Sequence, residues 1–576
     1  MDSRPIDVAP GEVVALAAEP SVGAAVVTEH GERRRWGQQD ALAELERLER
    51  DIGPRWVWWT PDTARSLVTS GLRPSRCWDL DTVHRLLHGG WRAGPARTWA
   101  SAHGLDTSEL PEVPRVDLFT IAEDTEPGPD RAVRTDGHLD PAWAGDAWRT
   151  DLDHLERWAE LALEVQQRQS AQLEQLTDRP AASATARSES AASLLCVELE
   201  HDGLPVDLAE AERIIASFVG PRPIDADHER RLVAERDDAV LQHLPIGLRD
   251  GVDLRNPASV KSLLRRAGIE VDDTRAWRLE RLRSEHPVVD ALLRWRKAER
   301  ISTTFGYRWL DEHVGTDGRL RGSWSGSDGA AGRMTATAGL HNLPSDLRPA
   351  IVAEAEHVFV RADLGQIEPR ILAAVSGDEA LAAATLDADM YAPVARRLGV
   401  SREIAKVAVL GAMYGQTTGH GAAALRGLDA AYPVAMRYLG DSARTAEAGN
   451  DLRTRGGRRV RMSGGGDPGI TERDQRSRAA ARGRYGRNAM VQGAAAEFFK
   501  TWAVIVRARL PVGAHIVLCL HDELLVHVPA SAAIDVAAVV DDALQETAAR
   551  WTQPELPSSV RFTADTTVIT RWSDAK

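Results

Sequence analysis

The sequence predicts a multidomain protein of mixed α/β and α+β architecture, and three observations lead to this fold class. A chain of 576 residues is too long for one compact core and predicts roughly two to four domains. About the first 170 residues alternate short apolar runs such as EVVALAA with helical stretches such as DALAELERLERDI, a pattern typical of an α/β layer domain. Further on, two strand segments, HVFVRADL and HIVLCLHDELLVHVP, enclose about 140 residues of helical pattern.

The middle of the chain is predicted to be mainly helical. Leu and Trp recur at helical spacing from 151 to 176, and the segment TDRPAASATARSESAAS that follows has the composition of a linker or of the start of a surface helix. We therefore place a domain boundary near Thr177. Beyond it, Asp207, Asn256 and Ser259 occupy expected helix starts.

Composition excludes several classes of protein. Lys and Arg number 71 against 85 Asp and Glu, and the net charge of −14 argues against a chain that nucleic acid coats on every side, although a local basic channel is compatible with it. No apolar run is long enough to cross a membrane, and the N-terminal segment lacks the pattern of a signal peptide. The three cysteines lie far apart, which indicates a reducing cytoplasm and no metal–thiolate site.

Acidic residues stand at the ends of the two strand segments. Asp363 closes the first, and His521, Asp522 and Glu523 lie between the apolar runs IVLCL and LLVHV. A hairpin with these residues at its tip, next to the first strand, would bring two or three carboxylates to one sheet edge. Such oxygen ligands suit Mg²⁺, and a pair of ions can hold the attacking and leaving oxygens of a phosphoryl transfer. The alternative is a solvated hairpin tip.

A second pattern, SREIAKVAVLGAMYGQ, begins with Ser401 at an expected helix cap and spaces four residues four apart on one expected helix face. Arg402 and Lys406 could bind an anionic triphosphate, with Leu410 and Tyr414 beneath a flat base. The alternative is an amphipathic helix whose two cations are solvated. A third pattern, at 453–487, holds eleven arginines against three acids, a local charge of +8 that would attract a phosphate backbone. The alternative is a solvated charged face.

In this order, these patterns resemble the family A DNA polymerases. ADLGQIEPRIL (362–372) resembles the palm motif D-Y-S-Q-I-E-L-R, REIAKVAVLGAMYG (402–415) the fingers motif R-x3-K-x3-F-x3-Y-G, and LHDELLV (520–526) the second palm motif H-D-E. GRMTATAGLHNLP, GGRRVR and RYGRNAMVQGAAA match further motifs of the family, so the resemblance covers roughly 195–576.

The resemblance implies a right-hand polymerase that follows a degenerate exonuclease domain of the RNase H-like type. The implied domains are the exonuclease-like region at 1–176, linker and thumb at 177–309, the first part of the palm at 310–375, the fingers at 376–483 and the second part of the palm at 484–576. We expect no 5′ nuclease domain. The implied activity is the addition of dNTPs to a primer 3′ end, in DNA repair or replication, by a monomer in the cytoplasm, at the bacterial nucleoid.

The resemblance also assigns roles to residues. Asp363 and Asp522 would bind two Mg²⁺ ions, with Mn²⁺ as a substitute, and with Lys406 they form the implied catalytic set. The implied nucleotide-binding residues are Arg402, Lys406, Leu410, Tyr414, Gln366, Glu368 and Tyr391. The residues implied to contact primer–template DNA are Arg333, Asn342, Arg484, Asn488, Gln492, His521 and Glu523.

Several positions depart from the family pattern. Leu410 replaces an aromatic residue that packs on the incoming nucleotide, and Tyr391 replaces a triphosphate-binding His. Leu364 and Gly365 replace Tyr-Ser, and Pro369 suits only an edge or a strand-to-helix turn. We therefore expect an active polymerase with reduced speed or fidelity.

The N-terminal region lacks most of the acids that a 3′–5′ exonuclease needs. Alanines surround Glu19 in the first strand, and Asp153 and Trp158 stand where Y-x3-D is expected. Only Asp79 and Asp81 resemble a family motif, so we expect a structural domain without proofreading.

Two other functions compete with this interpretation. A phage-type single-subunit RNA polymerase shares the fingers and H-D motifs but lacks Q-I-E, so Gln366 and Glu368 favour DNA. A polymerase-derived DNA-binding protein without catalysis would explain Leu410 and Tyr391. Binding alone, however, would not need Asp363, Lys406 and Asp522 together.

Overall fold

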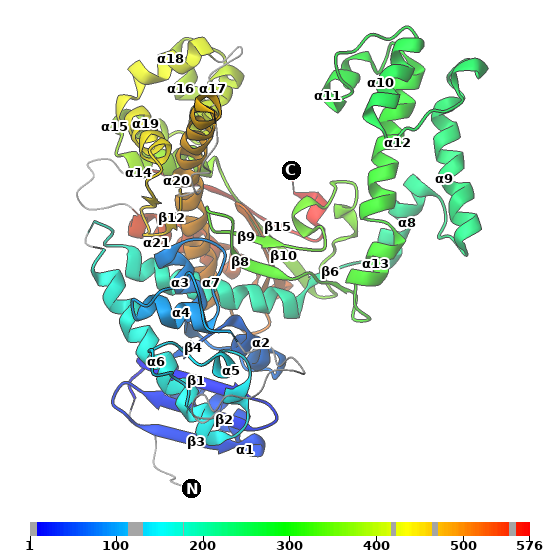
Figure 1. Cartoon of the computed structure of the whole chain (residues 1–576). Helices are drawn as coiled ribbons and strands as arrows, with labels where there is room; N and C mark the ends of the chain where they lie inside the picture. Colours follow the sequence, from blue (N-terminus) through cyan, green and yellow to red (C-terminus); the bar gives the residue numbers. More distant parts are fainter. Residues whose placement is uncertain are drawn as a thin grey trace. The chain divides into compact units, whose positions relative to one another are not determined.

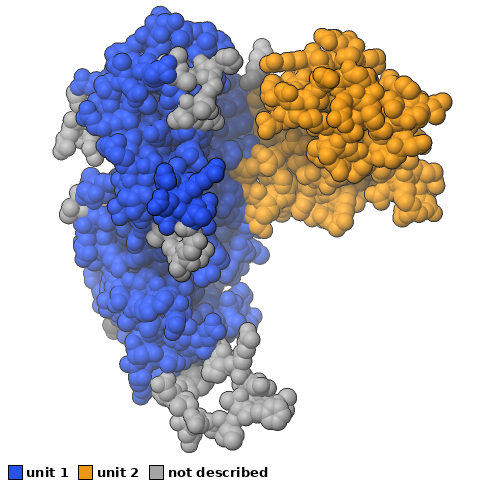
Figure 2. Space-filling model, turned by 45° about the horizontal axis from the view of Figure 1, so that its top comes forward, with its two compact units in different colours: residues 1–202, 324–335, 359–568 blue, residues 203–323, 336–358, 569–576 orange. Residues whose placement is uncertain are grey.

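The computed structural model describes residues 8–112, 131–176, 178–415, 422–462, 471–551 and 560–575. The chain forms two compact units, drawn in different colours in Figure 2, and Figure 1 labels its helices and strands. The first contains residues 1–202, 324–335 and 359–568, and the second contains 203–323, 336–358 and 569–576. Mixed α/β architecture, as predicted from the sequence, is confirmed. No helix in the described ranges is long and apolar enough to cross a membrane.

The N-terminal part of the first unit is built on a five-stranded sheet in the order β3-β2-β1-β4-β5. The strands are β1 (Val13–Glu19), β2 (Gly23–Thr28), β3 (Arg33–Gly37), β4 (Arg55–Trp58) and β5 (Arg76–Asp79). β1, β2 and β3 pair antiparallel, whereas β1, β4 and β5 pair parallel.

Alternate residues of β1 point into two separate cores, as the period of a strand requires. Val14 and Leu16 pack on one face, and Ala15 and Ala17 on the other. Helices cover both faces: α1 (Gln38–Asp51), α2 (Pro61–Thr69), α3 (Leu80–His88), α4 (Pro95–Ala102), α5 (Pro141–Ala144), α6 (Leu152–Glu174) and α7 (Ala182–Asp202). The apolar runs at the start of the chain are therefore strands with both faces buried.

Helix α7 differs from the linker or surface helix that its composition predicts. It packs against α20 (Glu472–Arg509) and β5 within the first unit, and Thr185, Ser188, Glu189 and Ser193 are buried. Small side chains allow close approach of neighbouring elements, so a stretch rich in Ala and Ser lies inside the unit instead of on its surface.

The rest of the first unit is a four-stranded sheet with helices beside it. The sheet order is β13-β14-β10-β15, with β10 (His357–Leu364), β13 (His515–Leu520), β14 (Glu523–Pro529) and β15 (Ala564–Ile569). The helices are α14 (Ile367–Ser376), α15 (Glu379–Ala384), α16 (Tyr391–Leu398), α17 (Arg402–Tyr414), α18 (Ala422–Ala431), α19 (Pro433–Glu447), α20 and α21 (Ala533–Trp551). The short strands β11 (Leu452–Arg453) and β12 (Arg459–Val460) form a hairpin, and β8 (Trp324–Asp328) pairs with β9 (Arg333–Ala336). The predicted HDE hairpin is confirmed as β13–β14.

The second unit is mainly helical, as predicted. Its helices are α8 (Leu208–Val219), α9 (Ala226–Leu241), α10 (Pro257–Arg266), α11 (Ala276–Leu279), α12 (Pro287–Thr304) and α13 (Tyr307–His313), and β6 (Leu204–Pro205) pairs with β7 (Arg319–Leu320). Asp207 and Asn256 are N-caps of α8 and α10, as expected. Ser259 is not a cap but lies inside α10, where its backbone N–H donates to the Asn256 side chain.

Candidate active site

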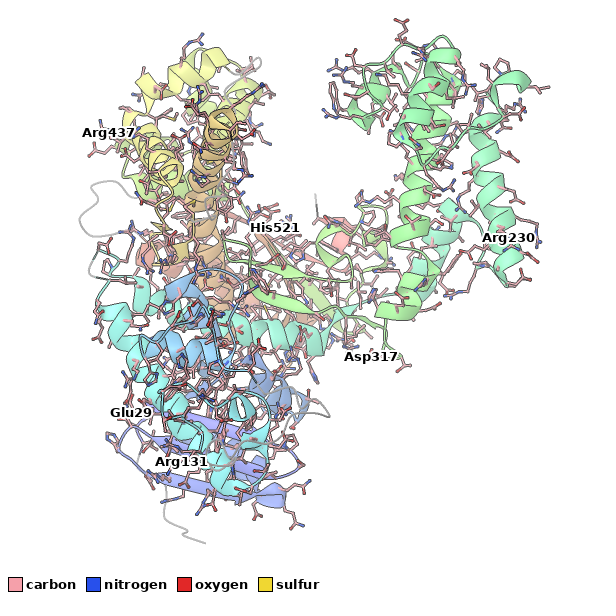
Figure 3. All side chains as sticks on the ribbon, in the orientation of Figure 1. Glu29, Arg131, Arg230, Asp317, Arg437 and His521 are labelled. Atoms are coloured by element: carbon pink, nitrogen blue, oxygen red, sulfur yellow. The ribbon has the colours of Figure 1, made fainter. Side chains whose placement is uncertain are left out.

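Three acidic residues meet at one end of the four-stranded sheet. Asp363 is near the end of β10, and Asp522 and Glu523 follow β13 at the hairpin turn. The Leu364 N–H donates to the Asp522 carbonyl at 2.8 Å, which joins the two segments. Burial, followed by the charges of Asp363 and Glu523, raises the pKa of Asp522 to about 6. His521, labelled in Figure 3, precedes this pair. Its backbone is in a left-handed conformation, with φ of 28°.

A buried arginine, which the motif analysis missed, lies among these carboxylates. Arg361 is 8% exposed, and its guanidinium donates to Asp363 Oδ2 at 2.7 Å and to Glu523 Oε1 at 2.9 Å. A third nitrogen lies 3.4 Å from Asp565 Oδ2. Burial raises the pKa of Asp363, and the charge of Arg361 opposes this shift. The signal in the sequence is a cation inside the apolar run HVFVRAD, but its partners become visible only when β10 and β14 are side by side.

The donor set fits a hard divalent cation. Asp363 and Asp522 offer carboxylate oxygens, the ligands that Mg²⁺ prefers. The raised pKa of Asp522 shows that burial and the neighbouring negative charges disfavour its ionised form, and a dication would relieve this cost.

A second cluster joins the start of α14 to α17 and α20. Glu368 accepts from Arg333 at 2.8 Å through Oε1 and from the Tyr414 hydroxyl at 2.9 Å through Oε2. The Gln492 amide donates to the same hydroxyl at 3.5 Å. The structure therefore brings together four residues that the sequence analysis selected from segments far apart in the chain. Pro369 lies in the first turn of α14, where its missing N–H is tolerated, so the predicted strand-to-helix turn is confirmed.

A third cluster centres on Asp389, a residue the sequence analysis did not select. It accepts from the Gln366 amide at 2.7 Å, and Arg402 forms an ion pair with it. The Arg402 guanidinium also lies 5.8 Å from the ring centre of Tyr391, which is buried. Asp389 was missed because attention went to Tyr391, two residues further on, which departs from the family pattern, and because Asp389 meets Arg402 only through the packing of α16 against α17.

Helix α17 begins as predicted, with Ser401 as its N-cap. Lys406 is exposed and Leu410 is half-buried on this helix. On α20, Arg484 is exposed, whereas Asn488 and Gln492 are half-buried. Asn342 lies in the second unit, where its carbonyl accepts from Arg300 at 2.9 Å.

The sequence profile of DNA polymerase family A matches residues 261–574. The chain belongs to DNA polymerase family A. The family A relatives include the thermostable DNA polymerase I of Thermus filiformis, 31% identical over 308 residues, which are 46% of this chain and 35% of the relative. The DNA polymerase I of Chloroflexus aurantiacus is 30% identical over 283 residues, which are 44% of this chain and 29% of the relative. The alignments thus span about a third of these relatives.

A solved family A structure has the same fold. It is the POL domain of Pol1 from M. smegmatis in complex with DNA primer-template and dNTP, and it matches with a TM-score of 0.67 at 20% identity. The match covers 99% of this chain and 96% of that one, so the N-terminal sheet is part of the shared architecture.

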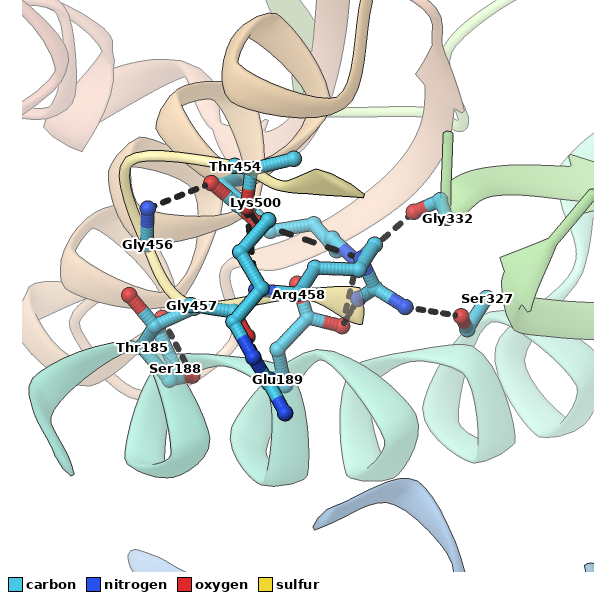
Figure 4. A network of polar contacts seen from close by, with 12 residues as sticks. Thr185, Ser188, Glu189, Ser327, Gly332, Thr454, Gly456, Gly457, Arg458 and Lys500 are labelled. Atoms are coloured by element: carbon cyan, nitrogen blue, oxygen red, sulfur yellow. Dashed lines mark hydrogen bonds and ion pairs between the residues drawn. The ribbon is translucent and has the colours of Figure 1, made fainter. Parts of the chain in front are cut away.

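An ionic network inside the first unit of this family A chain supports the second cluster (Figure 4). Glu189 on α7 lies 2.5 Å from both Arg458 and Lys500, and the exposed fractions of all three side chains are 3% or less. Lys500 also donates to the carbonyls of Gly332 at 2.7 Å and Gly326 at 3.1 Å. Gly332 directly precedes Arg333, so the network fixes the backbone that presents Arg333 to the second cluster.

The acids of the N-terminal sheet are engaged in structural hydrogen bonds. Asp79 caps α3 and accepts from the Trp58 indole at 3.2 Å. Asp81 accepts from the Gly94 N–H at 2.9 Å and from the Thr98 hydroxyl at 3.0 Å. Glu19 pairs with Arg149 at 3.0 Å, and Asp153 pairs with Arg35.

Proposed function

We propose that the chain is a template-directed DNA polymerase that adds dNTPs to a primer 3′ end by phosphoryl transfer. The observation that carries the proposal is the pair of carboxylates, Asp363 and Asp522, at one end of the four-stranded sheet. The same chain also contains the second cluster, around Glu368. Membership of family A and the primer-template and dNTP named for the structural relative support DNA and dNTPs as partners.

Asp363 and Asp522 would hold divalent metal ions, Mg²⁺ or Mn²⁺. When bound, the ions would neutralise charge on the reacting phosphate and lower the pKa of the primer hydroxyl. The two side chains supply the carboxylate oxygens that would bind the ions. Arg361 orients Asp363 and Glu523 before any ligand enters.

Helix α17 carries the side chains proposed to bind the nucleotide. Arg402 would leave its ion pair with Asp389 and bind the triphosphate instead. Lys406 is exposed and available to the same anion. Glu368, held by Arg333 and Tyr414, would occupy the space next to the sugar and exclude a 2′-hydroxyl. Leu410 offers the base no aromatic surface, which favours reduced speed or fidelity.

The DNA would contact residues on α20 and at the HDE turn. We assign this role to Arg484, Asn488 and Gln492 on α20 and to His521 and Glu523 at the turn. We assign it also to Arg333 on β9 and to Asn342. The N-terminal domain is structural and does not proofread, since Asp79 and Asp81 already accept hydrogen bonds from their own domain. The chain acts as a monomer in DNA repair or replication in the cytoplasm, at the nucleoid.

Primer extension tests the proposal. A labelled primer–template is incubated with Mg²⁺ and each dNTP or rNTP, with the wild type, Asp522→Ala and the matched exposed variant Asp535→Ala. We expect the wild type and Asp535→Ala to extend with dNTPs, and Asp522→Ala to bind the DNA without extending it. Without dNTPs the primer should keep its length. DNA binding by a wild type that does not extend the primer would make the chain a polymerase-derived binding protein, and shortening would restore a nuclease role to the N-terminal domain.

A further inference from the structure

A cavity of about 300 Å³ lies in the first unit and shares no lining residue with the three clusters described above. Its walls come from five elements: the start of β4, α7, the turn between β11 and β12, α20 and α21. Its volume is at the lower end of the roughly 300–1,000 Å³ of ligand sites in proteins, which suits a small ligand and not a macromolecule.

Arginines dominate the charge of this cavity. Arg55, Arg187, Arg455 and Arg550 line it, and no carboxylate is among the described lining residues. A chain with a net charge of −14 has acids in excess, so four arginines without an acid are an unusual local composition.

Three of the four guanidinium groups have no ion pair with the described residues. Arg55 donates to the Cys77 carbonyl at 3.3 Å, Arg455 lies 5.9 Å from the ring centre of Trp551, and Arg187 is exposed. Arg550 alone pairs with an acid, Glu546.

The like charges also oppose one another. Burial and then the charge of Arg187 lower the pKa of Arg55, so these two cations are close enough to repel. An anion between them would relieve the repulsion and would gain charge-assisted hydrogen bonds from both sides.

We propose that this cavity binds a small anion with two linked phosphates, either free pyrophosphate or the diphosphate of a nucleotide. Guanidinium groups from separate elements can each donate a pair of hydrogen bonds to phosphate oxygens. The hydroxyls of Thr185, Ser188 and Thr501 line the same space, and Val504 and Trp551 give it an apolar wall. Because the ligand would bridge α7, α20 and β4, its binding stabilises the first unit.

Isothermal titration calorimetry on the full chain, in EDTA, tests the site with pyrophosphate and with ADP as probes. The double variant Arg55→Gln/Arg187→Gln should bind pyrophosphate at least tenfold more weakly than the wild type. The exposed pair Arg230→Gln/Arg308→Gln, which loses the same charge in the second unit, should bind like the wild type. Arg402→Gln/Lys406→Gln removes the proposed triphosphate site and should retain pyrophosphate binding.

The two probes distinguish the two sources of the diphosphate. Equal affinity for pyrophosphate and ADP would mean that the phosphates alone determine the affinity of the cavity. Tighter binding of ADP would mean that the apolar wall contributes as well. Pyrophosphate binding that disappears in Arg402→Gln/Lys406→Gln, or that keeps its wild-type affinity in Arg55→Gln/Arg187→Gln, overturns the proposal, as does its absence from the wild type.

Chemical protection gives a second measurement that needs no variant. Phenylglyoxal modifies arginines, and mass spectrometry locates the products. Pyrophosphate should protect Arg55, Arg187 and Arg455 in the wild type and leave Arg230 reactive. Unchanged modification of the three cavity arginines contradicts the site even if the variants fail to fold.

Discussion

The buried amine of Lys500 gives the sharpest test of how the first unit is held together. Lys500→Met removes an ion pair with Glu189 at 2.5 Å and two hydrogen bonds, to the carbonyls of Gly332 and Gly326. Breaking a buried pair by removing one partner costs about 3–5 kcal/mol. Glu189 keeps Arg458 as a partner at 2.5 Å, and the variant no longer buries an ammonium. We therefore expect a loss of unfolding free energy at the lower end of this range, about 3 kcal/mol.

An exposed pair of similar length provides the control. Lys297 lies 2.6 Å from Asp346, with side chains 51% and 28% exposed, and an exposed ion pair contributes at most about 1 kcal/mol. Urea unfolding of Lys500→Met and Lys297→Met, with hydrogen exchange in α7 and α20 for the first variant and in α12 for the second, compares the same substitution in two environments. Equal losses of unfolding free energy in the two variants would refute the reasoning.

The pH dependence of the same group has a defined sign. Burial lowers the pKa of Lys500 from 10.5 to about 8, so between these values the unfolded chain binds more protons than the folded one. Stability therefore rises with pH above about 8 through this group. The rise should be absent from Lys500→Met, and a variant that kept it would show that another group is responsible.

Three further outcomes can be measured separately. Arg361→Gln removes the cation from the carboxylate cluster, so Mn²⁺ should bind the free protein at least tenfold more tightly in water-proton relaxation titrations; unchanged or weaker binding contradicts this. Burial raises the pKa of Asp81 to about 7, so the folded state holds its proton more tightly and stability falls as pH rises from about 4 to 7. Between pH 5 and 7, the unfolding free energy of Asp81→Asn, measured in urea, should fall by about 2 kcal/mol less than that of the wild type. An equal fall in the two proteins would exclude Asp81 as its source. Glu368→Ala should raise the rNTP share of single-nucleotide incorporation at least tenfold, and unchanged selectivity would mean that Glu368 does not face the sugar.

Local chemistry explains which features the sequence could predict. Asp207, Asn256 and Ser401 are caps because a short polar side chain before a helix satisfies free N–H groups, and this depends on neighbours in the chain. The hairpin β13–β14 follows equally from two apolar runs around a polar turn. Asp363 and Asp522 were therefore found at the correct ends of their strands.

The partners of these residues depend on packing between distant segments, which periodicity does not report. Arg361 meets Glu523 across 162 residues of sequence, and Lys500 meets Glu189 across 311. The segment of α7 was predicted as a linker or the start of a surface helix because of its Pro, Ala, Ser and Thr content, yet small side chains also let it pack tightly against α20. Such pairs become predictable only once the fold is known.

Before any ligand is present, the groups proposed to bind substrate are already paired within the chain. Asp363 accepts from Arg361, Arg402 pairs with Asp389, and Tyr414 donates to Glu368. A ligand that uses one of these groups must exchange an existing partner, so the free energy of binding is the difference between two interactions. The Arg402 pair is exposed and is cheap to exchange, whereas Arg361 is buried and stays in place. We therefore expect Asp389 to affect mainly nucleotide affinity, and Arg361 to set the charge of the carboxylate cluster in every state of the enzyme.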